Sequence, residues 1–161
     1  EENYPAEHRS VILWDHGGGS MKGVCNDEQF YNDSLTLPEM QSAFAKAYEE
    51  SGRKYEFVGF DACLMATAET ALMLNDHADY MIASEETEPG IGWYYTDWLT
   101  AWSENTSMST LEIGKNIIDD FVETCARKCK GSPATLSIVD LAEAEAKAKA
   151  AEAKSLDAGE K

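Results

Sequence analysis

Length and charge narrow the classes of function open to this chain. Its 161 residues, 43% of them hydrophobic, are enough for one compact domain with its own core. The formal net charge of −17 would repel nucleic acids and anionic membrane surfaces, so we expect neither as a partner. No run reaches the roughly 18 consecutive apolar residues that a membrane-spanning helix needs.

The first half of the chain predicts a strand, a glycine-rich loop and a helix. The apolar run Ser10–Trp14 indicates a buried strand, and Asp15-His-Gly-Gly-Gly19 directly after it indicates a loop. Polar residues dominate 21–34, which we interpret as a loop. Thr36-Leu-Pro-Glu39 is a capping box, and apolar residues at four-residue spacing predict a helix that ends at Gly52.

The middle of the chain predicts two further strands with a helix between them. Residues 55–60 are strand-like and lead into Asp61-Ala-Cys63, which precedes a helix-favouring stretch from Leu64 to about Leu74. Residues 80–83 indicate a third strand. The following segment, 84–93, is so rich in glycine, proline and charge that it predicts a loop.

The last part of the chain predicts three helices and one strand. Residues 94–102 favour a short aromatic helix, and the capping box Ser109-Thr-Leu-Glu112 opens a long one that ends by Gly131-Ser-Pro133. Residues 135–139 alternate as a strand. An Ala, Glu and Lys-rich helix should follow up to Lys154, with residues 155–161 as a frayed tail.

This alternation predicts an α/β fold with a mostly parallel sheet and helices on both faces. In such sheets ligands bind beyond the carboxyl ends of the strands. His16, Cys63 and the loop 84–93 each follow a predicted strand. We therefore expect all three at one edge of the sheet.

These positions suit cysteine-based catalysis. A helix that begins just after Cys63 would stabilise its thiolate through the helix dipole, and a nearby His16 would serve as the base. The backbone N–H groups of Gly17 and Cys63 are the candidate oxyanion donors. The alternatives are a packing cysteine, a structural histidine and glycines that only form a tight turn.

Four ordered blocks of the sequence resemble the clostripain family of cysteine peptidases. They are VILWDHGGG (11–19), GVCNDE (23–28), FDACLMA (60–66) and SEETEPG (84–90). The resemblance runs from about residue 3 to residue 140, and its His-Gly and Asp-Ala-Cys signatures are similar to those of caspase-like peptidases. It implies a caspase-like fold and an endopeptidase that cleaves after arginine or lysine.

The resemblance also implies roles for individual residues. Cys63 would be the nucleophile and His16 the general acid and base of a reaction through an acyl-enzyme. Asp61 would lie near the pocket for the basic side chain of the substrate. The second choices for carboxylates in the pocket or on its rim are three glutamates of the loop 84–93, namely Glu85, Glu86 and Glu88. Trp93 would lie either on the cleft wall or in the core.

The extent of the resemblance bears on domain organisation. A caspase-like sheet should have a further strand before Asn3, so residues 1–154 are interpreted as the catalytic core of a longer protein or of one chain of a processed precursor. Maturation by self-cleavage would use Lys22, the basic residue in the predicted loop 21–34. Relatives are typically secreted or on the surface of bacterial cells, which is the location expected here.

Two rival functions remain open. One is a non-catalytic acidic binding module that holds Ca²⁺ through Asp27, Glu28, Asp33 and the loop 85–88, although no twelve-residue calcium loop is present. The other rival function is that of a thiol oxidoreductase. This hypothesis is less favoured because the sequence lacks a Cys-x-x-Cys motif. For the peptidase we expect no required cofactor, with calcium dependence left open.

Overall fold

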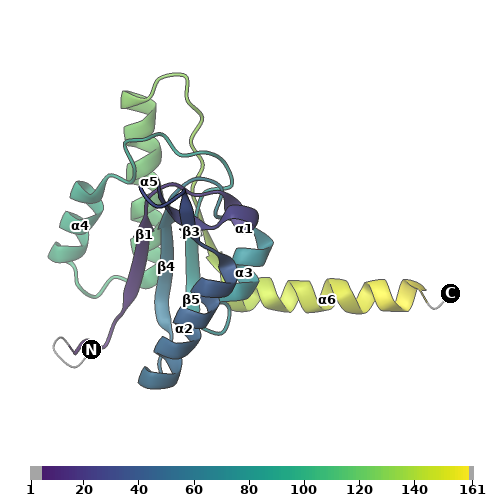
Figure 1. Ribbon diagram of the computed structural model, residues 1–161. Helices are drawn as coiled ribbons and strands as arrows, with labels where there is room; N and C mark the ends of the chain where they lie inside the picture. The colour runs from purple at the N-terminus through teal and green to yellow at the C-terminus, as the bar shows by residue number, and fades with distance from the viewer. Residues whose placement is uncertain (1–4, 160–161) are drawn as a thin grey trace.

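A four-stranded sheet forms the centre of the computed structural model, which describes residues 5–159 (Figure 1). The strand order is β1-β4-β5-β6; β1, β4 and β5 are parallel, and β6 is antiparallel to β5. The predicted α/β fold with a mostly parallel sheet is confirmed. The strands are β1 (Ser10–Trp14), β4 (Tyr55–Asp61), β5 (Ala78–Ala83) and β6 (Ser137–Asp140).

Helices cover both faces of the sheet, as predicted. Side chains alternate along β4, so Val58 packs with α2 (Leu37–Ser51) and α3 (Ala68–Leu74). On the opposite face, Phe57 packs with α4 (Tyr95–Glu104) and α5 (Thr110–Lys128). These two apolar layers hold the sheet rigid between them and so fix the positions of the loops at its edge.

Both predicted capping boxes are present. The backbone N–H of Thr36 donates to the Glu39 carboxylate at 2.9 Å, and that of Ser109 donates to Glu112 at 2.8 Å. Hydrogen bonds from Thr36 and Ser109 lower the pKa values of the two glutamates. Helix α2 ends at Gly52, whose φ of 68° is in the left-handed region that glycine enters without strain.

The predicted loop 21–34 is wrong in part. Helix α1 (Gly19–Lys22) ends inside it, and a hairpin of β2 (Val24–Asp27) and β3 (Asp33–Leu35) follows. Tyr31 and Asn32 turn the hairpin with φ values of 62° and 58°. Strands of three and four residues are too short for their alternation to stand out from the polar composition.

The predicted start of the helix after Cys63 is also wrong. Helix α3 begins at Ala68, and Thr67 caps it by accepting a hydrogen bond from the Thr70 N–H at 3.1 Å. Leu64 has a φ of 64°, which is incompatible with a right-handed helix. Cys63 therefore lies in a loop rather than at a helix N-terminus.

Helix α6 (Leu141–Gly159) extends away from the body of the molecule (Figure 1). Leu141 is buried, whereas residues 146–155 are all exposed. The helix continues through Gly159. The predicted fraying of 155–161 stays a prediction, and residues 160 and 161 lie outside the described residues. Among the described residues, no helix is long and apolar enough to cross a membrane.

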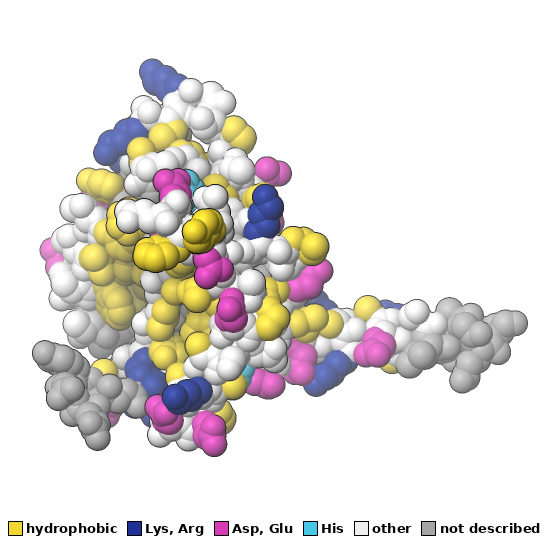
Figure 2. All heavy atoms as spheres, in the orientation of Figure 1, with side chains coloured by type: hydrophobic (Ala, Val, Ile, Leu, Met, Phe, Trp, Pro, Cys, Tyr) yellow, Lys and Arg dark blue, Asp and Glu magenta, His cyan; other side chains and the backbone are white. Residues whose placement is uncertain are grey.

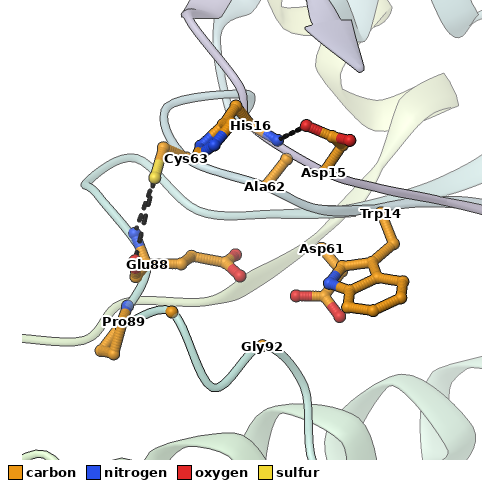
Figure 3. Close-up of a pocket in the computed structure, with 10 residues that line it drawn as sticks. Trp14, Asp15, His16, Asp61, Ala62, Cys63, Glu88, Pro89 and Gly92 are labelled. Atoms are coloured by element: carbon orange, nitrogen blue, oxygen red, sulfur yellow. Dashed lines mark hydrogen bonds between the residues drawn. The ribbon is translucent and has the colours of Figure 1, made fainter. Parts of the chain in front are cut away.

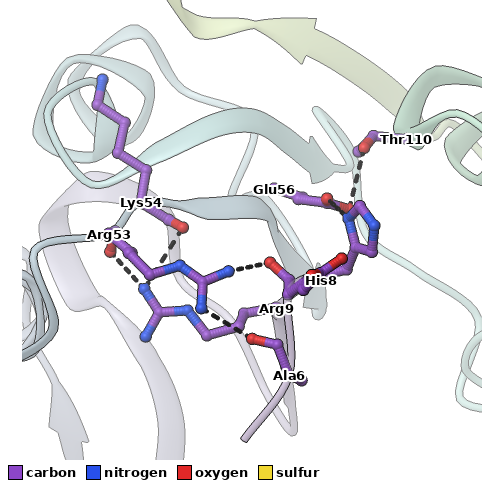
Figure 4. A network of polar contacts seen from close by, with 8 residues as sticks. Ala6, His8, Arg9, Arg53, Lys54, Glu56 and Thr110 are labelled. Carbon is purple, nitrogen blue, oxygen red and sulfur yellow. Dashed lines mark hydrogen bonds and ion pairs between the residues drawn. The ribbon is translucent and has the colours of Figure 1, made fainter.

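The segment before β1 is tied to the base of the sheet (Figure 4). The Arg53 guanidinium donates to the Ala6 carbonyl at 2.8 Å, and Arg9 donates to Ser51 Oγ at 3.2 Å. Arg9 also stacks over the ring of Tyr55 at 5.0 Å. These contacts fix the amino end of β1, opposite the edge where His16 and Cys63 emerge.

An apolar hollow runs between β1 and α2. Figure 2 shows hydrophobic side chains gathered over this part of the surface. Among the described strands, β1 pairs with β4 alone and is an edge strand. The residues that line the hollow include Val11, Leu13, Met40, Phe44 and Tyr55.

Candidate active site

The parallel pairing of β1 and β4 brings the two candidate catalytic residues together. Trp14, the last residue of β1, is paired with Asp61, the last residue of β4. His16 and Cys63 follow these two positions, so both emerge at the carboxyl edge of the sheet. Here lies a pocket of about 350 Å³ (Figure 3), lined by Trp14, Asp15, His16, Asp61, Ala62, Cys63, Glu88, Pro89, Gly90 and Gly92.

A glycine allows the two catalytic loops to touch. A Cβ atom at Gly17 would lie 2.2 Å from the Cys63 carbonyl oxygen, so any larger residue would push the loops apart. The β2–β3 hairpin secures the other side of the loop, since the Cys25 N–H donates to the His16 carbonyl at 3.0 Å. Within residues 5–159, the backbone N–H groups of Gly17 and Cys63 donate no hydrogen bond.

The thiol of Cys63 is half-buried beneath the loop that follows β5. The backbone N–H of Glu88 donates to Cys63 Sγ at 3.2 Å, and the Glu88 carbonyl lies 3.8 Å from the sulfur. The predicted helix dipole at Cys63 is wrong because α3 begins only at Ala68. The N–H group that faces the sulfur belongs to Glu88 instead.

His16 lines the same pocket (Figure 3). Its side chain is 70% exposed, and Nε2 is 3.6 Å from Oε1 of Glu28 in the β2–β3 hairpin. Asp15 accepts a hydrogen bond from the His16 backbone N–H at 2.5 Å, so it holds the loop rather than the ring. Among the described residues, His16 and Cys63 share the pocket without a hydrogen bond between them.

Asp61 is a buried carboxylate at the base of the pocket. It is 3% exposed and accepts hydrogen bonds from the Trp93 N–H, at 3.0 and 3.1 Å, and from the Tyr95 hydroxyl at 2.9 Å. A Cβ atom at Gly92 would lie 3.0 Å from Asp61 Oδ2. Burial raises the pKa of Asp61, while the bonds from Trp93 and Tyr95 act in the opposite direction.

Glu88 adds a second carboxyl group to this pocket. Figure 3 shows its side chain running toward Asp61. Both carboxyl oxygens of Glu88 are buried, and they interact with the Asp61 carboxyl group and the Trp93 side chain. Burial, followed by the charge of Asp61, raises the pKa of Glu88 to about 9. At neutral pH Glu88 is therefore protonated.

The other predicted pocket residues lie elsewhere. Glu85 is exposed and accepts a hydrogen bond from Ser137 Oγ at 2.9 Å, while Glu86 is exposed and contributes its carbonyl to the Leu64 N–H at 3.1 Å. Trp93 is 3% exposed and packs in the core, so it is not on the cleft wall.

Sequence reasoning missed two aromatic residues of the site. Trp14 is 73% exposed and lines the pocket, and the Tyr95 hydroxyl holds Asp61. The position of Trp14 at the end of a strand, directly before Asp15-His16, was a usable signal. Nothing in the sequence pattern relates Tyr95 to Asp61.

No metal centre is formed by the described residues, in which no three His, Cys, Asp or Glu side chains gather closely enough to hold an ion. Asp27, one of the residues considered for calcium, accepts hydrogen bonds from the Gln29 and Phe30 N–H groups at 2.9 and 3.2 Å. It therefore shapes the hairpin turn. Calcium dependence stays a prediction.

Comparison with solved structures agrees with the fold. The chain is similar to a secreted C11 cysteine protease from Bacteroides thetaiotaomicron in complex with an irreversible peptide inhibitor (TM-score 0.72, 22% identity, 90% of this chain and 43% of that chain). An inactive zymogen C11 protease from Parabacteroides distasonis gives a TM-score of 0.65 at 23% identity, with 89% and 37% of the two chains covered. A clostripain from Bacteroides thetaiotaomicron in complex with the peptide inhibitor BTN-VLTK-AOMK gives 0.56 at 21%, with 73% and 47% covered.

These relatives are distant, and this chain spans less than half the length of each of them. Among curated proteins, no relative matches. The model of the clostripain family, peptidase C11, matches residues 1–155 and so nearly the whole sequence. With His16 and Cys63 at one pocket of a mostly parallel sheet, the chain is a member of the clostripain family of cysteine peptidases.

Proposed function

We propose that this chain carries the catalytic part of a cysteine endopeptidase that cleaves after arginine or lysine. Cys63 is the nucleophile, and His16 is the general acid and base. The observation that carries the proposal is the pocket in which the Cys63 thiol and two buried carboxyl groups, those of Asp61 and Glu88, lie together. A buried carboxyl pair without a cationic partner among the described residues favours a positively charged side chain and rejects an anionic one.

The geometry supports a two-step hydrolysis. His16 takes the proton of the Cys63 thiol as the sulfur attacks the carbonyl carbon of the substrate, and the oxyanion that forms accepts hydrogen bonds from the Gly17 and Cys63 N–H groups. His16 then protonates the leaving amine, which breaks the C–N bond and leaves an acyl-enzyme. A water molecule deprotonated by His16 attacks the thioester. The C–S bond breaks, the acid product leaves, and His16 returns the proton to the Cys63 sulfur.

Labelling with a chloromethyl ketone tests this assignment. An arginyl chloromethyl ketone should alkylate Cys63, because the guanidinium binds beside Asp61 and Glu88 and so places the reactive carbon at the sulfur. The measurement is the mass of intact protein and the site of the adduct after digestion. A neutral alanyl chloromethyl ketone should react far more slowly. Equal labelling by the two reagents, or an adduct at Cys25 instead, would contradict the proposal.

The proposal also covers where the protein is located and what it binds, both inferred from its relatives. We include in the proposal that the protein is secreted or at the bacterial cell surface, because structures similar to it are described as secreted proteases. Its partners are protein or peptide substrates with arginine or lysine, together with other chains of a processed precursor. The inhibitor BTN-VLTK-AOMK of the clostripain from Bacteroides thetaiotaomicron has lysine (K) as its last residue, which supports a basic preference. The chemistry needs no cofactor, and activity in excess EDTA would exclude dependence on calcium.

Self-cleavage after Lys22 is part of the same proposal. Lys22 is exposed at the end of α1, outside the carboxyl pocket, and its carbonyl accepts a hydrogen bond from Ser34 Oγ at 2.5 Å. Cleavage there requires α1 to unwind so that the Lys22 side chain can reach a pocket. We expect purified protein to accumulate a fragment that begins at Gly23, detected by N-terminal sequencing. Lys22→Ala and Cys63→Ala should each prevent it; a fragment that still forms in the Cys63→Ala protein would show a contaminating protease.

A further inference from the structure

The carboxyl pocket has an unusual charge balance. Asp61 is held by hydrogen-bond donors from two directions, whereas the two oxygens of Glu88 are buried beside the Asp61 carboxyl group and the Trp93 side chain. Two ionised carboxylates this close in a buried site would repel each other strongly. Among the described residues that line the pocket there is no lysine or arginine to offset that repulsion. An empty pocket is therefore stable only if one of the two groups holds a proton.

We infer that Asp61 and Glu88 share one proton in the empty pocket and release it when the cationic side chain of a substrate enters. This inference rests on the proposed preference for basic residues and adds how the pocket achieves it. The guanidinium or ammonium group supplies the positive charge that lets both carboxyl groups ionise. The proton passes to the solvent, so the pocket exchanges one positive charge for another and never holds two uncompensated negative charges.

Glu88 is the group that loses the proton. The carboxylate form of Asp61 is stabilised by the Trp93 N–H and the Tyr95 hydroxyl. At Glu88, burial and the charge of Asp61 outweigh the opposing effect of the Trp93 side chain, and the pKa of Glu88 is raised to about 9. The pocket is also faced by Asp15, His16 and Cys63.

Two groups on the helices behind the pocket keep their protons near neutral pH. Burial and the charge of Asp61 raise the pKa of Tyr95, and burial raises that of Cys125 in α5 to about 11.

The direction of the pH dependence follows from this exchange. Below about pH 9 the empty pocket binds a proton that the occupied pocket does not. Raising the pH therefore strengthens binding of a cation, by up to about tenfold per pH unit for one proton released. A neutral ligand of the same shape gains nothing, because it does not change the ionisation of the pair.

Calorimetry on a protein that cannot turn over separates this exchange from catalysis. Cys63→Ala protein is titrated with acetyl-arginine amide at pH 7.0 in phosphate and in Tris, whose ionisation enthalpies differ. The difference between the two binding enthalpies gives the protons released, and we expect close to one per ligand. Acetyl-citrulline amide, which is neutral, is the matched ligand control. A Cys63→Ala, His16→Ala double variant should still release the proton, which excludes His16 as its source.

Glu88→Gln on the same background is the decisive variant. It keeps the shape of the side chain but removes the exchangeable proton, so arginine amide should bind without proton release and with affinity independent of pH between 6.5 and 8.5. Binding by the Cys63→Ala protein without proton release, or release that survives Glu88→Gln, overturns the inference but leaves the basic pocket intact. Failure of arginine amide to bind better than citrulline amide overturns the basic pocket itself.

Discussion

Replacing Cys63 by alanine is expected to reduce hydrolysis of an arginyl reporter peptide to the background rate of buffer. The sulfur is the atom that forms the acyl-enzyme, and Cys63 is the one thiol among the pocket residues in the part of the chain that the structure describes. Because Cys63 lies in a loop and is only half-buried, its truncation should leave the circular dichroism spectrum and melting temperature nearly unchanged. Cys129→Ala, at the end of α5, is the matched control and should retain full activity.

His16→Ala tests the second member of the pair. Loss of a general acid and base commonly costs about 10²- to 10⁴-fold in rate, and we expect a fall in kcat of that size with KM little changed. The side chain is 70% exposed, so its removal should not unfold the protein. Reporter hydrolysis that survives in either the Cys63→Ala or the His16→Ala protein would rule out the proposed mechanism.

The main strands and the capped helices were predictable because local and tertiary preferences agree there. Strand β4 is a run of apolar residues buried on both faces, and α2 and α5 carry complete capping boxes. The start of α3 was not predictable. The Leu64 N–H is bonded to the Glu86 carbonyl at 3.1 Å and that of Ala66 to the Ser84 carbonyl at 2.9 Å. These long-range bonds override a helix-favouring composition.

The site was predictable to the extent that it depends on topology. His16 and Cys63 follow adjacent parallel strands, and such strands end at a common edge. Which glutamate of the loop after β5 enters the pocket depends on the path of that loop, and the sequence pattern does not encode this path. Glu88 is turned inward where its N–H meets the Cys63 sulfur, while Glu85 is held outside by Ser137.

The Asp61→Asn variant should lose most of its preference for basic substrates. The Trp93 N–H and the Tyr95 hydroxyl stabilise the charged form of Asp61, whereas Glu88 is protonated at neutral pH. Breaking a desolvated ion pair commonly costs about 2–5 kcal/mol, which corresponds to a fall in kcat/KM of roughly 30-fold to several thousand-fold for an arginyl reporter. A glutaminyl reporter should be affected much less, because it never formed the ion pair.

The structure excludes a helix cap as the main role of Asp61, since Thr67 caps α3 and the Asp61 carboxylate is bonded to Trp93 and Tyr95. Asparagine can accept the same two hydrogen bonds, so the fold should survive and the change should isolate the effect of the charge.

Once residue 61 is neutral, Glu88 loses the repulsion that favours its protonated form and becomes easier to ionise. Activity on arginyl substrates should therefore recover partly as the pH rises. Combining Asp61→Asn with Glu88→Gln removes this recovery. Glu85→Gln, which neutralises an exposed carboxylate outside the pocket, should leave the ratio of arginyl to glutaminyl cleavage unchanged. If Asp61→Asn leaves that ratio unchanged as well, the specificity role belongs to Glu88 and not to Asp61.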